Sequence, residues 1–166
     1  MFKEGRSMRE KIFEAKDVVI KFNLRGHTLT AIRGASIDLY DGETLAIVGE
    51  SGSGKSVFTK SFIGMLDTNG WVEQGEMLLD GVNIAKYKTE KEWLKVRGKK
   101  IAMVFQDPMT ALDLTRTVEQ QIAEAVTVHS PRLSRQALHA RVMELMTLVG
   151  IREPETRGKL YPYHFS

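Results

Sequence analysis

An eight-residue segment, residues 49–56, constrains this chain more than any other part of it. It reads Gly-Glu-Ser-Gly-Ser-Gly-Lys-Ser and fits the phosphate-binding loop pattern G-x-x-x-x-G-K-[ST] at every required position. Residues 44–48 before it are apolar and predict a strand, and residues 57–65 after it predict a helix. The motif needs this context of strand, glycine-rich turn and helix start. The alternative, an incidental turn followed by Lys-Ser, is therefore disfavoured.

The residue types in this segment suit the chemistry of phosphate binding. Glycines let successive backbone N–H groups turn toward an anion without a Cβ atom in the way, and the positive end of the following helix favours phosphate. Lys55 can reach the β- and γ-phosphates, and the Ser56 hydroxyl can hold Mg²⁺. We therefore expect a nucleoside triphosphate and Mg²⁺ as cofactors. The expected binding residues are Gly49, Glu50, Ser51, Gly52, Ser53, Gly54, Lys55 and Ser56.

Composition limits the other classes of function. The 166 residues are 42% hydrophobic and 27% charged, as is ordinary for a soluble protein, and the net charge is only +3. The basic cluster at residues 86–100 is interrupted by Glu90 and Glu92, which indicates a solvated helix face and disfavours a nucleic-acid partner. There are no cysteines, and the four histidines match no metal-ligand spacing.

The chain shows neither a signal peptide nor an apolar run near the ~20 residues that span a bilayer. We expect it in the cytosol, acting at a membrane only through a partner.

The order of patterns predicts an α/β fold, in which antiparallel β structure is followed by a P-loop core and then by helices. A continuous apolar run at residues 101–105 predicts a strand covered on both faces, and Asp80-Gly81 predicts a turn. Thr117 and Gln120 predict a capping box. The other predicted strands are residues 18–22, 29–32, 35–40 and 76–79, and the other predicted helices are residues 91–97, 118–126 and 134–149.

Gln106 follows the apolar run at residues 101–105 directly and opens a Pro-containing loop. A glutamine at the carboxyl end of a core strand can reach the crevice where open α/β sheets bind ligands. Its amide oxygen can ligate Mg²⁺, and the amide can orient a water. Alone this is a weak signal, because glutamines in loops are usually surface residues.

Three segments together make the chain resemble the ATP-binding subunits of ABC transporters, and more narrowly those of the oligopeptide/dipeptide importer group. They are residues 42–56, residues 105–112 (Phe-Gln-Asp-Pro-Met-Thr-Ala-Leu) and residues 161–166 (Tyr-Pro-Tyr-His-Phe-Ser). The resemblance runs from about residue 18 to residue 166. It implies a partial nucleotide-binding domain over residues 1–166. Its parts would be an antiparallel β part with the first core strand (12–48), the P-loop core (49–105), the Q-loop (106–116) and an incomplete helical subdomain (117–166).

The resemblance also implies roles for single residues. Residues 49–56 correspond to the Walker A loop, and Gln106 to the Q-loop glutamine that touches Mg²⁺ and senses the γ-phosphate, so Lys55 and Gln106 are the catalytic candidates. Phe22 is a candidate for stacking on adenine, with a strand core residue as the equal alternative. Residues 107–117 match the segment that contacts the membrane permease subunits. Asp113-Leu114 departs from relatives that carry a Pro there, which is expected to alter the loop's stiffness.

Family members continue from the position of Ser166 into the Gly-Gly signature, a Walker B strand with its general-base Glu, and a switch His. A chain ending at Ser166 is expected to lack efficient hydrolysis and to leave apolar faces exposed. Residues 77–80 offer no substitute Walker B, because Gly81 stands where a Glu is needed.

The leading hypothesis is an ATPase subunit that drives peptide uptake from the cytoplasmic face of the membrane. Its partners would be a second, identical or related, ATPase subunit, the permease subunits and, indirectly, an extracytoplasmic peptide-binding protein. The alternatives are a stand-alone nucleotide-binding regulatory module and a non-transport ABC ATPase.

Overall fold

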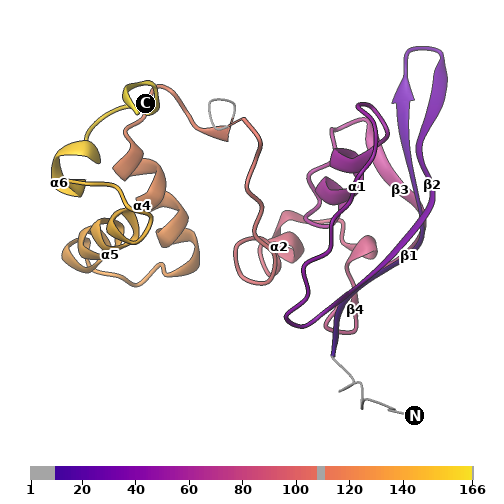
Figure 1. The fold of residues 1–166 in the computed structure, drawn as a ribbon, viewed down its shortest axis with the longest axis horizontal. Coiled ribbons are helices and arrows are strands. Elements are labelled where there is room, and N and C mark those ends of the chain that lie inside the picture. Colours follow the sequence, from indigo (N-terminus) through magenta and orange to yellow (C-terminus); the bar gives the residue numbers. More distant parts are fainter. Residues whose placement is uncertain (1–9, 108–110, 166) are drawn as a thin grey trace, which may run out of the picture. The chain divides into compact units, whose positions relative to one another are not determined.

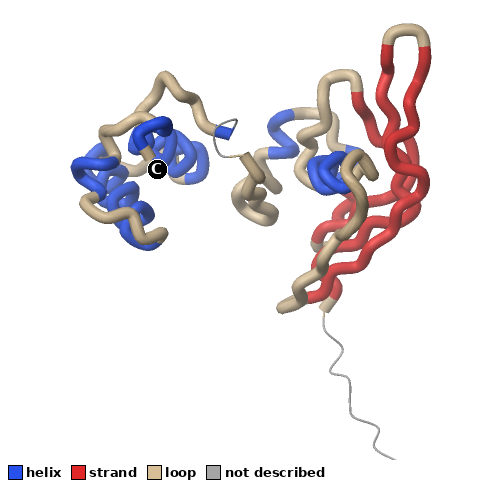
Figure 2. The backbone as a smooth tube through the Cα atoms, turned by 45° about the horizontal axis from the view of Figure 1, so that its top comes forward, coloured by secondary structure: helices blue, strands red, loops and turns tan. Residues whose placement is uncertain are grey.

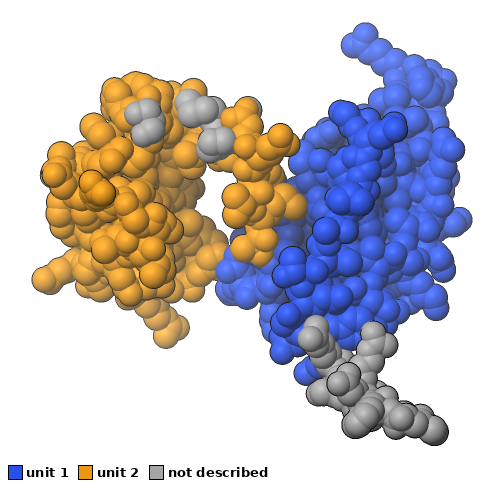
Figure 3. Space-filling view, in the orientation of Figure 1, with its two compact units in different colours: residues 1–101 blue, residues 102–166 orange. Residues whose placement is uncertain are grey.

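The computed structural model describes residues 10–107 and 111–165. The chain forms two compact units, residues 1–101 and residues 102–166, shown in different colours in Figure 3. Each unit is described by itself.

A four-stranded antiparallel sheet dominates the first unit, with the strand order β2-β1-β3-β4 (Figure 1). Its strands are β1 (Lys11–Leu24), β2 (His27–Tyr40), β3 (Gly70–Leu79) and the short β4 (Val82–Asn83). The strands predicted within β1, β2 and β3 are confirmed, and all are longer than expected. The predicted turn at Asp80-Gly81 is also confirmed, since it joins β3 to β4.

A bulge in β1 explains how one long strand covers one core. Phe13 and Ala15 are buried at odd positions, and Val18 and Ile20 at even ones. The pairing of β1 with β2 shifts between Ala15 and Val18, and Asp17 takes a positive φ of 49° there. The extra residue returns both sets of side chains to the same face of the sheet. The backbone N–H of Asp17 donates to the Ser36 hydroxyl at 2.8 Å, which secures the bulge.

The helix α1 (Lys55–Ser61) lies over the buried face of this sheet (Figure 1). Phe58 is buried, and the Phe62 ring that follows the helix lies 4.7 Å from Phe13 and 4.8 Å from Phe58 between ring centres. The helix predicted over residues 57–65 therefore exists but begins earlier and ends sooner. Two short elements complete the unit, η1 (Ile84–Lys86) and α2 (Glu90–Trp93).

Two predicted strands are wrong: residues 44–48 and 101–105 form no strand. In the described part of the chain, neither segment takes part in a sheet, apart from an isolated bridge between Arg97 and Ile101. A strand depends on hydrogen-bonded neighbours for its backbone groups. Without them, the apolar runs stay irregular, and Val48 and Val104 are 87% and 97% exposed.

The second unit is helical (Figure 2). It comprises α4 (Val118–His129), α5 (Arg135–Leu148), α6 (Pro154–Arg157) and η2 (Pro162–His164). Both long helices were predicted, and the Thr117–Gln120 capping box is confirmed by both of its hydrogen bonds. Val142, Met143 and Met146 of α5 form the core, against Val118 and Ile122 of α4. In the described ranges, no helix combines the length and apolar character that crossing a membrane requires.

Candidate phosphate-binding site

The glycine-rich loop enters α1 through a tightly packed glycine. Gly54 is the N-cap of α1 with φ 94° and ψ 0°. A Cβ atom there would lie 2.7 Å from Cδ1 of Ile32 and 3.3 Å from the backbone oxygen of Ala31, both in β2. Only glycine has both the required backbone angles and the required lack of a side chain. The end of the loop therefore rests directly on the sheet.

The Lys55 side chain turns back over the loop. Its ammonium group donates to the carbonyl oxygens of Gly49 and Glu50, at 2.7 Å each, and lies 3.4 Å from the Ser53 hydroxyl. An ammonium group has three donors and a compact positive charge. Because it contacts both carbonyl oxygens, the Lys55 nitrogen lies inside the turn. The oxygens of a phosphate could replace these carbonyl oxygens as acceptors there.

The first turn of α1 carries no side-chain cap and no acidic residue. The first N–H groups of a helix have no partner within the helix, and a carboxylate nearby would oppose an anion. The helical ladder begins with the Phe58 N–H donating to the Gly54 carbonyl at 2.9 Å. The backbone at the start of α1 therefore suits a phosphate group.

Ser56 is exposed at the same end of α1. Its hydroxyl is a hard oxygen ligand, and Mg²⁺ in nucleotide sites commonly takes few protein ligands and completes its shell with phosphate oxygens and waters. The residues present therefore fit Mg²⁺ as a companion of a bound phosphate. Across the described ranges, no cluster of three His, Asp or Glu residues could hold a metal ion by itself.

Phe22 is buried at 9% exposure and belongs to the sheet core. Its ring covers Gly70, where a Cβ atom would lie 2.5 Å from the ring carbon Cε1. The burial favours the core interpretation of Phe22. Stacking on adenine stays a prediction.

Gln106 is exposed and belongs to the second unit. Its shared role with the loop at Lys55, which belongs to the first unit, therefore stays a prediction. The neighbouring Pro108, Met109 and Thr110 lie outside the described residues, as does Ser166.

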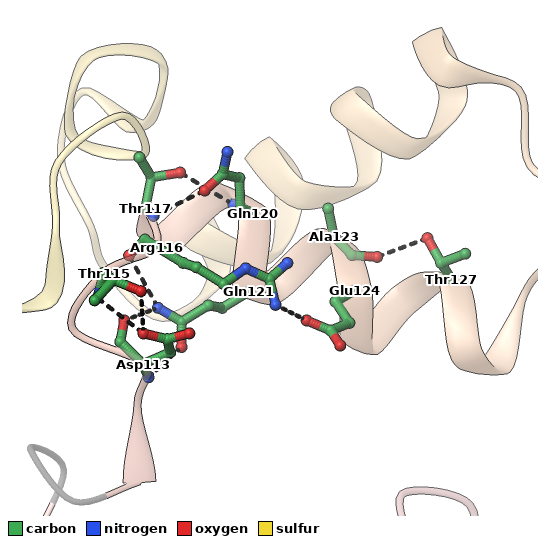
Figure 4. Close-up of polar contacts among 9 residues, drawn as sticks. All are labelled: Asp113, Thr115, Arg116, Thr117, Gln120, Gln121, Ala123, Glu124 and Thr127. Atoms are coloured by element: carbon green, nitrogen blue, oxygen red, sulfur yellow. Dashed lines mark hydrogen bonds and ion pairs between the residues drawn. The ribbon is translucent and has the colours of Figure 1, made fainter.

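Residues 111–117, the described end of the segment expected to contact a permease, form a braced turn (Figure 4). The carboxylate of Asp113 accepts from the Thr115 N–H at 2.8 Å and from the Thr115 hydroxyl at 2.7 Å. The Gln121 amide donates to the carbonyls of Asp113 and Arg116, at 2.8 and 3.1 Å, and accepts from the Asp113 N–H at 2.9 Å. These bonds restrain the loop at Asp113-Leu114.

The same bonds set the charge of this turn. Hydrogen bonds from Thr115, first from its hydroxyl and then from its backbone, lower the pKa of Asp113 below its ordinary value. The carboxylate is thus ionised at neutral pH. Arg116 and Glu124 form an ion pair beside it.

Two parts of these sites were missed by the sequence analysis. Ile32 supports Gly54 across the sheet, and Gln121 braces the turn at Asp113 from α4. Ile32 lies in an ordinary strand pattern, and nothing in it signals a contact with a loop more than twenty residues away. Gln121 lies next to the capping residue Gln120, which gave the only signal in this segment.

The sequence matches the family described as ABC transporter over residues 32–166. The oligopeptide transport ATP-binding protein AmiE of Streptococcus pneumoniae is 44% identical over 93% of this chain and 43% of its own length. The dipeptide transport ATP-binding protein DppD of Lactococcus lactis is 45% identical over 95% of this chain and 45% of its own. The chain thus spans less than half the length of these relatives.

Solved structures show the same fold. The ATP-binding cassette MJ0796, in a dimeric post-hydrolysis state bound to ADP and Pi, matches with a TM-score of 0.75 at 23% identity, over 93% of this chain and 63% of that one. The cbiO1 protein of Clostridium perfringens, part of the ABC transporter complex cbiONQ, matches with a TM-score of 0.68 at 24% identity, over 95% of this chain and 56% of that one.

Proposed function

Because this chain belongs to the ABC transporter family, we propose that it binds ATP with Mg²⁺ through residues 49–56 and is part of an ATPase that drives peptide import. The observation that carries the proposal is the position of the Lys55 ammonium group, 2.7 Å from two carbonyl oxygens of the loop that precedes it. A phosphate bound in the loop would replace these neutral acceptors with charged oxygens, which form stronger hydrogen bonds.

Each residue of the loop has a role in this proposal. Gly54 keeps the loop against the sheet, and the backbone N–H groups at the start of α1 donate to phosphate oxygens. Lys55 neutralises charge on the β- and γ-phosphates. Ser56 would be a ligand of Mg²⁺, and Gln106 is the proposed second ligand and the residue that would orient a water. Bound Mg²⁺ supplies the positive charge that stabilises the transferred phosphoryl group.

The names of the relatives, which include oligopeptide and dipeptide transport, support peptide import as the process that this ATPase would drive. Its partners would be a second ATPase subunit and membrane permease subunits, with an extracytoplasmic peptide-binding protein acting indirectly. Residues 107–117 would contact the permease, and the braced turn at Asp113 gives part of that segment a defined shape. With these partners, the chain would act at the cytoplasmic face of the membrane.

A substitution of Lys55 tests the nucleotide site. Lys55→Ala removes a charged donor to phosphate, and a hydrogen bond to a charged group contributes about 1.5–3 kcal/mol. We expect the dissociation constant for Mg-ATP, measured by titration calorimetry, to rise roughly 10- to 100-fold. The matched control is Lys60→Ala, which removes the same charge five residues along α1. Equal affinities of both variants would refute the assignment of the site.

A further inference from the structure

The far end of the phosphate-loop helix has its own fixed support. Beyond α1 the chain closes with Gly64 at φ 62°, where the Gly64 N–H donates to the Ser61 carbonyl at 3.1 Å and the Met65 N–H to the Lys60 carbonyl at 3.0 Å. This is a Schellman ending, in which the reversed bonds satisfy earlier carbonyls of the helix. The later carbonyls, those of Ile63 and Gly64, need partners from elsewhere.

Arg97 supplies these partners from a segment more than thirty residues away. Its Nε donates to the Ile63 carbonyl at 2.7 Å, and its Nη2 to the Gly64 carbonyl at 3.0 Å. Its Nη1 forms an ion pair with Glu90 at 2.6 Å. One planar guanidinium group thus uses its fork to hold two successive carbonyls and a carboxylate, which a lysine cannot do.

Trp93 closes the contact from the side. A Cβ atom on Gly64 would lie 2.2 Å from Cε2 of Trp93, so the indole ring lies directly against the backbone of Gly64. The Arg97 guanidinium carbon lies 5.7 Å from the centre of the same ring, within cation–π range. We call Gly64, Glu90, Trp93 and Arg97 the helix-end clamp.

Arg97 differs from the exposed basic residues that surround it in the sequence. The sequence predicts residues 86–100 as a solvated basic face, and Lys100 fits that prediction, with an exposed side chain paired to Asp80. The Arg97 side chain is only 27% exposed, and its Nε and Nη2 atoms point to the backbone after α1. Arg97 therefore does not belong to the solvated face that the sequence predicts for residues 86–100.

We propose that Arg97 is a positioning residue for nucleotide binding, an inference that rests on the proposed function. Besides the packing of Phe58 on the sheet, the helix is supported at both ends. Gly54 rests on Ile32 at one end, and Arg97 holds the carbonyls of Ile63 and Gly64 at the other. The seven residues of α1 span about 10 Å at the rise of an α-helix. Release of the far end lets the helix tilt, and the tilt moves the Lys55 ammonium group and the loop backbone away from the phosphates.

The test compares nucleotide affinity at matched stability. Arg97→Lys keeps a cation but loses the fork, and we expect its dissociation constant for Mg-ADP to rise about 10-fold, which corresponds to the loss of about one hydrogen bond to a charged group. Lys100→Gln, a control in the same basic cluster, is expected to leave the affinity unchanged. Ile84→Val, at a buried core position, controls for a general loss of stability measured as the thermal midpoint.

A double variant separates positioning from simple stabilisation. If Arg97 acts through Lys55, then Arg97→Lys added to Lys55→Ala weakens Mg-ADP binding much less than about 10-fold, because interacting residues are not additive. Equal affinity of Arg97→Lys and Ile84→Val at the same thermal midpoint overturns this inference and leaves the proposed function standing. Absence of nucleotide binding by the unsubstituted chain overturns both.

Discussion

The contact between Gly54 and Ile32 allows a quantitative prediction for the entrance to α1. Gly54→Ala introduces two costs. The left-handed backbone at φ 94° costs an L-residue about 1–2 kcal/mol. The new Cβ atom would lie 2.7 Å from Cδ1 of Ile32, and such overpacking adds about 1–3 kcal/mol. We therefore expect a loss of about 2–5 kcal/mol in the free energy of unfolding.

The structure offers controls for each cost separately. Gly34 has the same φ of 94°, and a Cβ atom added there would meet nothing within 4 Å, so Gly34→Ala is expected to cost only the backbone part, about 1–2 kcal/mol. Ile32→Val removes the Cδ1 atom that the new methyl group at position 54 would meet, at a cost of about 0.5–1.5 kcal/mol by itself. Combined with Gly54→Ala, it is expected to recover about 1–2 kcal/mol relative to the sum of the two single changes.

Urea unfolding followed by tryptophan fluorescence measures these differences. The sequence has two tryptophans, Trp71 and Trp93, and both belong to the first unit, so the signal reports the unit that contains the loop. Additivity of Gly54→Ala and Ile32→Val within about 0.5 kcal/mol would refute the contact as the source of the cost. So would equal losses for Gly54→Ala and Gly34→Ala.

Two predictions concern the helical unit. Thr117→Ala removes the N-cap of α4 and is expected to lower the free energy of unfolding by about 1 kcal/mol, measured by urea unfolding followed by circular dichroism. The control Thr127→Ala removes only a hydrogen bond to the Ala123 carbonyl within the helix and is expected to be neutral or slightly stabilising. Equal losses in the two variants would contradict the capping role of Thr117. His139 of α5 contacts Glu119 of α4 at 2.8 Å and Glu155 of α6 at 3.1 Å, and these hydrogen bonds, that to Glu119 first, raise its pKa above the ordinary value of 6.5. Because the pKa of His139 is raised in the folded state, its contribution to stability is complete below pH 6.5 and is lost as the pH rises through the pKa of the folded state. An NMR titration should show a lower pKa for His139 in Glu119→Gln. A His139→Gln variant whose stability keeps the same dependence on pH above 6.5 would contradict the stabilising role of the protonated histidine.

The sequence predicted those elements whose causes are local. The capping box at Thr117 and Gln120 lies within four residues, and the turn at Asp80-Gly81 within two. The strands of the antiparallel sheet are also readable, because their residue pattern lies within each strand, whereas the pairing of β1 with β3 joins distant segments that the sequence does not reveal. Contacts across the fold were not predictable in this way. Arg97 stands in a basic run that resembles many solvated helices, and its partners at Ile63 and Gly64 appear in no local pattern.

The need for hydrogen-bonded neighbours explains both why two predicted strands do not form and why the phosphate loop does. The apolar character of residues 44–48 and 101–105 predicted two strands, but apolar character supplies no hydrogen-bonded neighbour. The phosphate loop depends on no such neighbour. Its shape comes from positive φ angles at Gly52 and Gly54, from the bonds of Lys55 to its own loop, and from the contact of Gly54 with β2. A loop with local bonds can therefore keep a defined geometry even where the segment leading into it is irregular. For this reason, we expect the affinity for Mg-ADP to fall when the supports of α1 at Ile32 and Arg97 are changed, and to change less when residues 44–48 are substituted.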